Sequence, residues 1–314
     1  MSLVKVLERD GGGFGLGRQE EALALAQRLP SLVVAARETA ASVMHGLHGR
    51  RRSGPGENFW QFRPYSFGEA QNRIDWRRSA RDDRIYVRER EWESAHTVAT
   101  WIDRSASMRF VSKLALQPKV DRAVVLGLAA ADLLVGGGER VALLGLTRPL
   151  AARDVVERFG VALAEDLRQR ARSGAPDEEL PAREPLARNA HAVLIGDFLS
   201  PAAEIEATIR ALAARGARGH LVLIADPVEE TFPFAGHTEF LDVDSPARLS
   251  VGEASAFREA YLGRLAAHRE AVREAVRRRG WTVTLHRTDR PASEALIALK
   301  LRLEAELAGA GRTP

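Results

Sequence analysis

The sequence predicts an α/β protein with a doubly wound, mostly parallel sheet and an amino-terminal extension rich in arginine and aromatic residues. Apolar runs of strand length alternate with longer segments of helical spacing from His96 onward. The first run, Thr97 to Ile102, is β-branched and aromatic, as a buried strand would be. Strands that alternate with helices in this way indicate a parallel sheet covered on both faces.

The remaining elements follow in order along the main part of the chain. Strands are expected at residues 97–102, 140–146, 191–195, 219–225 and 281–286. Helices are expected at residues 119–135, 152–172, 201–215, 254–279 and 292–307. Between residues 226 and 242, Asp-Pro and Phe-Pro turn signals predict a loop and a hairpin.

We divide the chain into four parts. Residues 1–49 form a leader and an amino-terminal helix, expected at Glu20 to Leu29 and ending before Pro30, with an ambiguous segment after it. Residues 50–94 form an extension whose aromatic side chains are expected to pack on the main domain. The main α/β domain spans 95–290, and a final helix and tail span 291–314.

Composition narrows the class of protein. With 45% hydrophobic and 28% charged residues among 314, the chain resembles an ordinary globular protein with a substantial core. The chain has no cysteine, which excludes disulfides, thiolate metal sites and cysteine nucleophiles. We find neither a signal peptide nor an apolar run of membrane-spanning length, and therefore expect a cytoplasmic protein.

The basic excess is almost entirely arginine, since only four of the 46 basic residues are lysines and the formal net charge is +4. One interpretation is a surface that binds polyanions. The other is a set of solvated side chains beside glutamate and aspartate, which the interspersed acids favour.

Polar residues follow the first strand at alternate positions, where ligands gather in an open parallel sheet. Asp103, Ser105 and Ser107 offer only oxygen atoms, which suit a hard cation such as Mg²⁺ or Mn²⁺. Asp197 follows another apolar run and could join them. The alternative is structural, because aspartate and serine after a strand commonly cap the next helix or bind loop amides.

The pattern Asp-x-Ser-x-Ser after a buried strand resembles the metal-ion-dependent adhesion site of von Willebrand factor A domains. The resemblance implies ligands from three loops, with Asp103, Ser105 and Ser107 in the first and Asp197 in the third. The second loop should supply a threonine, but the comparable segment, 173–177, has none. Because of that departure, we expect weaker metal binding than at a complete site.

A second resemblance covers about residues 49–288. The chain resembles the bacterial family called domain of unknown function 58, in which an arginine-rich and aromatic segment precedes a von Willebrand A-like domain. The motifs that carry it are Arg63-x-Tyr65, Gly68-Glu69, Arg73-Ile74-Asp75-Trp76, Ala80-Arg81, Tyr86-Val87-Arg88-Glu89 and Asp226-Pro227-x-Glu229. Glu69 departs from the aspartate that is usual in the family.

The resemblance implies a non-enzymatic protein-binding scaffold that acts with a MoxR-type AAA+ ATPase in maturing or remodelling other proteins. A held cation with an open position would capture a carboxylate of the ATPase or of a client protein. One alternative is a metal-dependent hydrolase or phosphatase that uses Asp103, but position 105 is serine where a second carboxylate would be needed. Another is nucleic-acid binding through residues 50–90, which the neighbouring carboxylates disfavour.

Overall fold

The computed structural model describes residues 18–48, 61–66, 74–81, 84–89, 96–174, 177–188, 190–241 and 248–310. The chain divides into two compact units. The first combines Met1–Gly46 with His96–Pro314, and the second is Leu47–Ala95. The predicted leader before residue 18 lies outside the described residues.

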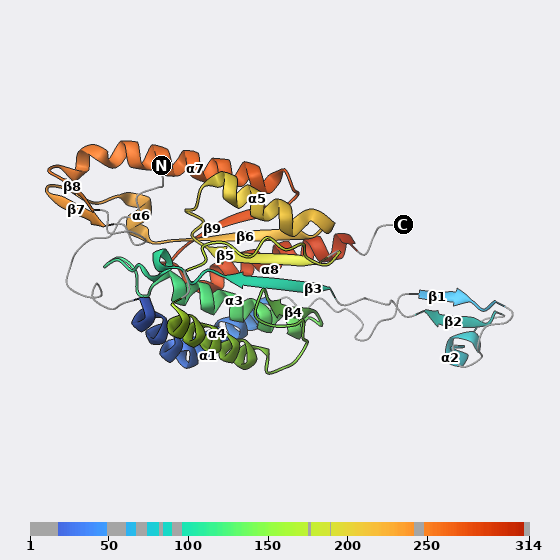
Figure 1. Cartoon of the computed structure of the whole chain (residues 1–314). Coiled ribbons are helices and arrows are strands. Elements are labelled where there is room, and N and C mark those ends of the chain that lie inside the picture. The colour runs from blue at the N-terminus through green and yellow to red at the C-terminus, as the bar shows by residue number, and fades with distance from the viewer. Residues whose placement is uncertain are drawn as a thin grey trace. The chain divides into compact units, whose positions relative to one another are not determined.

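A five-stranded sheet forms the centre of the first unit (Figure 1). Its strands are β3 (Thr97–Ile102), β4 (Arg140–Leu143), β5 (His191–Gly196), β6 (Arg218–Ala225) and β9 (Thr282–Arg287). They lie in the order β4-β3-β5-β6-β9, and every neighbouring pair is parallel. The strand order therefore reverses between β3 and β5, which is where an open parallel sheet forms its ligand crevice.

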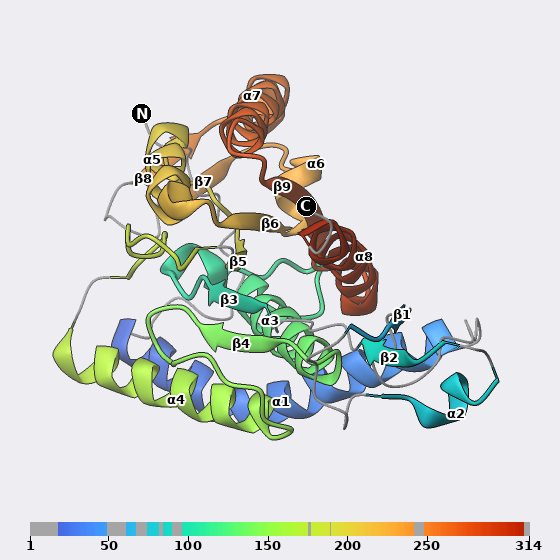
Figure 2. The same ribbon diagram turned by 90° about the vertical axis from the view of Figure 1, so that its right-hand side faces the viewer.

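Helices cover both faces of this sheet, so the predicted doubly wound α/β class is confirmed (Figure 2). On one face lie α1 (Arg18–His48), α3 (Lys119–Gly136), α4 (Val155–Ser173) and α8 (Ala292–Ala310). On the other face lie α5 (Ala202–Leu212) and α7 (Arg258–Arg277). Apart from α1, each of these helices stands close to the range that the apolar spacing predicted, which shows that periodicity located the elements well.

Side chains of β3 show how the two faces are filled. Val98 and Ile102 belong to the core beneath α3, while Ala99 and Trp101 belong to the core beneath α5 and α7. Alternation along the strand divides its residues between the two layers. The helix α3 approaches closely because Gly127 has no Cβ, and a Cβ there would stand 2.6 Å from the Ile102 side chain.

The first helix differs from its prediction. We expected it to end before Pro30, but α1 continues from Arg18 through Pro30 to His48. Proline lacks the N–H that would bond to the carbonyl four residues earlier, which normally ends or kinks a helix. Here buried side chains on both sides of Pro30, including Leu25 and Ala36, pack against the same core. Burial of this continuous apolar face outweighs the lost hydrogen bond.

The segment after β6 contains a hairpin, but its second strand lies beyond the predicted range of 226–242, and a short helix stands where a loop was expected. Its strands are β7 (Thr238–Leu241) and β8 (Arg248–Val251), which pair antiparallel, and a short helix α6 (Pro227–Thr231) precedes them. Phe232, Phe234 and Phe240 form a small aromatic core under the hairpin. The hairpin is thus attached at the carboxyl-terminal side of β6 by its own cluster of apolar side chains.

The second unit contains a short antiparallel ribbon, β1 (Gln61–Pro64) with β2 (Tyr86–Glu89), and one helical turn, α2 (Trp76–Ser79). Asp75 caps α2 by accepting a hydrogen bond from the Arg78 N–H at 2.9 Å. The Arg78 guanidinium lies 5.1 Å from the centre of the Tyr86 ring. Phe59, Trp60 and several other aromatics of this segment lie outside the described residues, so packing of the extension on the main domain stays a prediction.

Among the described helices, none is both long enough and apolar enough to cross a bilayer. The cytoplasmic location stays a prediction.

Candidate functional site

Asp103 and Asp197 lie side by side at the carboxyl-terminal edge of the sheet. They follow the neighbouring strands β3 and β5, and the parallel pairing extends to Asp103, whose N–H donates to the Ile195 carbonyl at 2.8 Å. This is the point where the strand order reverses. The structure therefore brings together the two carboxylates that the sequence places 94 positions apart.

Gly196 makes the close approach of these two loops possible. A Cβ at this position would stand 2.8 Å from the Asp103 Cβ and 3.0 Å from its Oδ2. Real Cβ atoms do not come this near, so a larger residue would displace the Asp103 side chain or the loop that carries it. Glycine is therefore required here by the close packing of the two loops, and not by a turn of the backbone.

The predicted oxygen atoms of the first loop are buried together. Asp103 is 1% exposed, and Ser105 and Ser107 are 1% and 3% exposed. The Asp103 Oδ1 accepts the Ser105 N–H at 2.9 Å, and the two serine hydroxyls lie 3.2 Å apart. The Asp103 Oδ2, however, is buried and has no hydrogen-bond partner among the described residues. One carboxylate oxygen thus organises the loop, as the structural alternative proposed, while the other is unused.

A buried lysine that the sequence analysis did not consider reaches into this site. Lys119, the first residue of α3, is 1% exposed and donates from its Nζ to Asp197 Oδ2 at 2.9 Å. The same Nζ donates to Glu229 Oε1 at 2.6 Å. The Lys119 ammonium is therefore a fixed positive charge that holds the ends of β5 and β6 together.

The pKa values in the site follow from burial and from these contacts. Burial raises the pKa of Asp103 well above its ordinary value, and the neighbouring Asp197 raises it further. Burial alone would lower the pKa of Lys119, but Asp197 and Glu229 outweigh it and hold that pKa above the ordinary value. Burial also raises the pKa of Glu229, although Lys119 opposes the shift. Lys119 is thus charged. Within the described residues Asp103 makes no ion pair, and the neighbouring Arg104, whose pKa burial lowers although Asp166 and Asp103 raise it, is paired with Asp166.

Glu229 is held by its own local structure. The segment Asp226-Pro227-Val228-Glu229 forms a capping box, in which the Asp226 side chain accepts the Val228 N–H and Glu229 Oε2 accepts the Asp226 N–H. This leaves Glu229 Oε1 for Lys119. Two features of the sequence could have identified Lys119 and Glu229 as part of the site. Lysine is scarce in this chain, and a capping box follows a strand that ends at the same edge.

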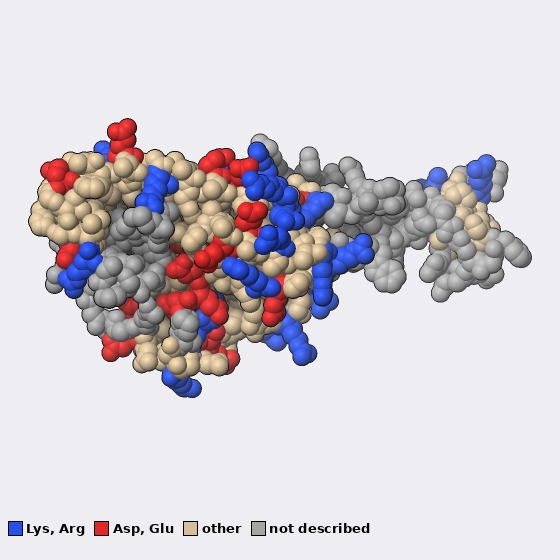
Figure 3. Space-filling model, turned by 45° about the horizontal axis from the view of Figure 1, so that its top comes forward, with Lys and Arg blue, Asp and Glu red and all other residues tan. Residues whose placement is uncertain are grey.

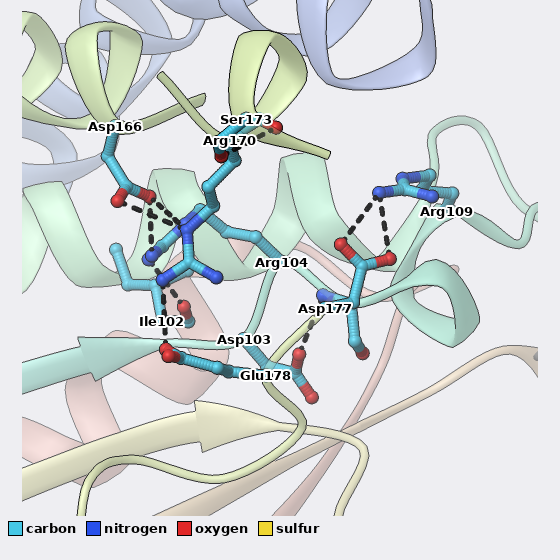
Figure 4. Close-up of polar contacts among 10 residues, drawn as sticks. Ile102, Asp103, Arg104, Arg109, Asp166, Arg170, Ser173, Asp177 and Glu178 are labelled. Carbon is cyan, nitrogen blue, oxygen red and sulfur yellow. Dashed lines mark hydrogen bonds and ion pairs between the residues drawn. The ribbon is translucent and has the colours of Figure 1, made fainter. Parts of the chain in front are cut away.

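The loop after α4 places acidic residues beside the site, where the resemblance to the adhesion site called for a threonine. Figure 4 shows Asp177 facing Arg109, and Glu178 facing Arg170, beside Asp103. The next residue, Glu179, accepts a hydrogen bond from the Ser200 hydroxyl at 2.7 Å and lies close enough to raise the pKa of Asp103. Residues 175 and 176 lie outside the described residues.

The donor set fits a divalent cation in charge and in chemistry. Asp103, Asp197 and Glu229 carry three negative charges when ionised, and Lys119 supplies one positive charge, so a divalent cation would balance the remainder. The unpartnered Asp103 Oδ2 and two hydroxyls are the oxygen ligands that Mg²⁺ accepts. Among the described residues no cluster of three or more His, Cys, Asp or Glu side chains could hold a metal ion, so a cation at this edge would also need hydroxyl or water oxygens as ligands.

An apolar loop borders the site. Residues 110–118 connect the serine loop to Lys119, and their side chains Val111, Leu114 and Leu116 are exposed, Leu116 by 95%. The loop is nevertheless fixed, because the Ser112 N–H donates to Asp226 Oδ2 at 2.9 Å. Large apolar side chains held in solvent next to a polar site are typical of a surface that binds another protein.

Together, the fold and this edge define a doubly wound α/β domain with a buried cluster of carboxylates, hydroxyls and one lysine at its switch point. The model of the family described as "Protein of unknown function DUF58" matches residues 61–271, and the chain belongs to this family.

Relatives of the chain share most of its length but not a known role. An uncharacterized protein of Mycobacterium bovis and one of Mycobacterium tuberculosis are each 30% identical over 284 residues, which cover 85% of this chain and 86% of the relative. Two solved structures also match. They are an aerotolerance-related membrane protein of Bacteroides fragilis and the conserved hypothetical protein BatB of Bacteroides thetaiotaomicron.

These two structures are 11% and 10% identical to the chain, with TM-scores of 0.36 and 0.35. They cover 67% and 68% of this chain and 100% of their own. Likenesses of this extent define neither function nor ligand.

Proposed function

We propose that the protein is a non-enzymatic binding module that holds a divalent cation at the carboxyl-terminal edge of its sheet and uses it to bind a partner protein. The observation that supports it most is the Asp103 Oδ2, a buried carboxylate oxygen without a hydrogen-bond donor among the described residues, beside a second carboxylate. A buried anion in this setting is stable only when it is protonated or when a cation compensates it.

In this proposal Asp103, Ser105, Ser107 and Asp197 hold Mg²⁺ or Mn²⁺, as in a metal-ion-dependent adhesion site. The cation supplies a Lewis-acidic position for a carboxylate of the partner. Lys119 keeps the Asp197 side chain in place and compensates Glu229. Ser112 and Asp226 fix the apolar loop 110–118, whose exposed leucines would bury against the same partner.

We propose binding and not catalysis because the Lys119 side chain is already held in ion pairs. Its ammonium is held between two carboxylates, and a protonated amine can act neither as a base nor as a nucleophile. The resemblance to the family also supports a MoxR-type AAA+ ATPase as the partner, with a carboxylate-bearing client as the second possibility.

Titration calorimetry with Mn²⁺ tests the cation directly. We expect one saturable site in the wild type and at least about tenfold weaker binding in Asp103→Asn, which keeps the shape of the side chain but removes its charge. Asp154→Asn, at an exposed carboxylate near the start of α4, is the matched control and should bind as the wild type does. Equal binding by both variants, or no saturable binding by the wild type, would reject the proposal.

A capture experiment then tests the partner. The wild type in Mg²⁺ should retain a MoxR-type ATPase from the lysate of a cell that encodes both proteins, and chelator or Asp103→Asn should release it. Leu116→Ser removes an exposed apolar side chain without touching the cluster, so we expect weaker capture with unchanged Mn²⁺ binding. If chelator and both substitutions leave the amount of captured ATPase unchanged, the proposed role is contradicted.

A further inference from the structure

Exposed arginines gather at the opposite, amino-terminal edge of the central sheet. Figure 3 shows Lys and Arg side chains concentrated at the end of the first unit where the strands begin. Exposed arginines that the topology places at this edge are Arg140, Arg188, Arg210, Arg215, Arg218, Arg277, Arg278, Arg279 and Arg302. We call this set the arginine edge. They come from the starts of strands, the ends of helices, the loop before β5 and the middle of α8, so no single helix or loop makes the cluster.

The fold explains why these residues meet. Arg140 and Arg218 are the first residues of β4 and β6, and Arg188 and Arg279 shortly precede β5 and β9. The four strands begin at one edge because the sheet is parallel, and they span the sheet from one side to the other, about 19 Å at the usual strand spacing. Arg302 joins them from α8, since its charge lowers the pKa of His220 at the start of β6.

Most of this charge is not compensated. Within the described residues Arg188, Arg210, Arg215, Arg218, Arg279 and Arg302 make no ion pair. The nearby carboxylates Glu206 and Glu274 both bind Arg278, and Glu306 lies 3.5 Å from the His191 ring. Arginines in the last turn of a helix can compensate its dipole, which accounts for Arg210, Arg215 and Arg277 but not for the arginines that begin strands.

We propose that the arginine edge is a docking surface for the anionic lipid headgroups of a membrane leaflet. Guanidinium groups bind phosphate and carboxylate oxygens in bidentate fashion, and a basic cluster of this size is strongly attracted to an anionic leaflet. The cluster extends across the whole width of the sheet edge, which matches a flat anionic surface better than a single ligand.

Nucleic acid fits this surface less well. Proteins that bind single strands usually combine a basic surface with exposed aromatic side chains on which bases stack. The exposed large aromatics of the described chain are Trp76, in the second unit, and Phe257, at the far end of α7. Trp281, the aromatic ring that the described chain places at this edge, is buried and donates its indole N–H to the Ala217 carbonyl at 2.9 Å. A pocket at the opposite edge is lined by Trp101, Arg104, Arg109, Arg170 and Asp177.

The test is sedimentation of the full chain with lipid vesicles. The probes are phosphatidylcholine vesicles with and without roughly a third of phosphatidylserine. The edge variant carries four substitutions, Arg188→Gln, Arg215→Gln, Arg218→Gln and Arg279→Gln. The control variant carries Arg168→Gln, Arg172→Gln, Arg258→Gln and Arg290→Gln, at exposed arginines near the end of α4, at the start of α7 and after the carboxyl end of β9. Each variant lowers the formal net charge from +4 to 0, because four of the 46 basic residues become neutral against 42 acids.

We expect the wild type and the control variant to sediment with anionic vesicles and not with neutral ones. Each basic side chain near an anionic leaflet contributes about fivefold, so the edge variant should partition at least about tenfold more weakly. Added salt should weaken the association in every case. All substituted side chains are exposed, and an unchanged melting temperature confirms that the variants fold.

Three results would overturn the proposal. The first is an equal loss in both variants, which would show a general effect of net charge. The second is an absence of sedimentation by the wild type with anionic vesicles. The third is association with single-stranded RNA in the absence of vesicle association, which would assign the arginine edge to nucleic acid.

Discussion

The charged side chains at the two edges of the central sheet differ in their burial and in their partners. At the carboxyl-terminal edge, Asp103 and Asp197 are 1% and 9% exposed, and a single lysine is fixed between Asp197 and Glu229. At the amino-terminal edge, most arginines stand in solvent with no ion pairs among the described residues. Burial forces the first set into a defined geometry, whereas water screens the second set and leaves it able to meet a partner.

This contrast predicts where substitutions are costly. Removing one member of a buried ion pair leaves its partner charged in a medium that solvates it poorly, while removing a solvated charge costs little. The largest effects are therefore expected at buried ion pairs, and smaller ones where a single buried group titrates or a close contact is disturbed.

Lys119→Met should have the largest effect on stability. The substitution leaves Asp197 and Glu229 buried together without their ammonium, and we expect a loss of about 3 to 5 kcal/mol in the free energy of unfolding at pH 7. Urea denaturation measures it. Lys300→Met is the control, because Lys300 makes only a surface pair with Glu304 and should cost less than about 1 kcal/mol. Similar losses of stability in both variants would show that a buried lysine and a surface lysine contribute alike.

At the amino-terminal edge of the sheet, the buried side chain of His220 makes the stability of the protein depend on pH. Burial, followed by the charge of Arg302, lowers the pKa of His220 to about 4 from 6.5, although Glu306 opposes the shift. The unfolded chain then binds this proton more readily than the folded protein, so stability falls as the pH drops from about 6.5 toward 4, by up to about 3 kcal/mol.

Unfolding curves of the wild type and His220→Gln over this pH range measure the difference. The variant should lose less stability on acidification, since its side chain does not titrate. Parallel curves would show that His220 does not contribute to the acid sensitivity.

Gly196→Ala tests the close approach that brings the two carboxylates together. A Cβ at 2.8 Å from the Asp103 Cβ must displace one of the loops, and we expect a loss of about 1 to 3 kcal/mol together with weaker Mn²⁺ binding. Gly263→Ala is the matched control in α7, where a Cβ meets nothing within 4 Å. That change should stabilise the helix by roughly 0.5 to 1 kcal/mol. Unchanged stability and binding in the Gly196→Ala variant would show that the approach is not tight.

Asp103→Asn should raise the melting temperature of the metal-free protein by a few degrees at most, roughly the effect of 1 kcal/mol. The folded-state pKa of Asp103 lies above its unfolded value, so its contribution is present at low pH and is lost as the pH rises through the folded pKa. The gain from the asparagine should therefore grow with pH. A variant that is less stable than the wild type at every pH would show that the charge of Asp103 is compensated without a metal.

The sequence predicted the fold from two local signals that the structure confirms. Apolar periodicity located each strand and most helices around the sheet, and Asp103 and Asp197 were placed at one edge because parallel strands end together. The extension of α1 through Pro30 was missed because the apolar face that stabilises it is buried by α3 and α4, which no local pattern reveals.

The candidate site was predicted only in part for a similar reason. Oxygen ligands are recognised from a short spacing, but the partner of Asp197 is a lysine 78 positions earlier, at the start of a helix. Glu229 was seen as part of a family motif and not as a member of the site, because its role depends on the capping box that turns one oxygen toward Lys119. The arginine edge likewise arises from topology, since its members are scattered through the sequence.

Anomalous diffraction from crystals grown with Mn²⁺ tests the central claim most directly, because it locates the cation rather than its effects. We predict one peak within ligand distance of the carboxylates of both Asp103 and Asp197, with Lys119 still bound to Glu229. The peak should disappear in crystals of Asp103→Asn. Manganese bound elsewhere, or no peak while the Asp103 Oδ2 remains enclosed without a partner, would contradict the assignment of this edge as a cation-dependent binding site.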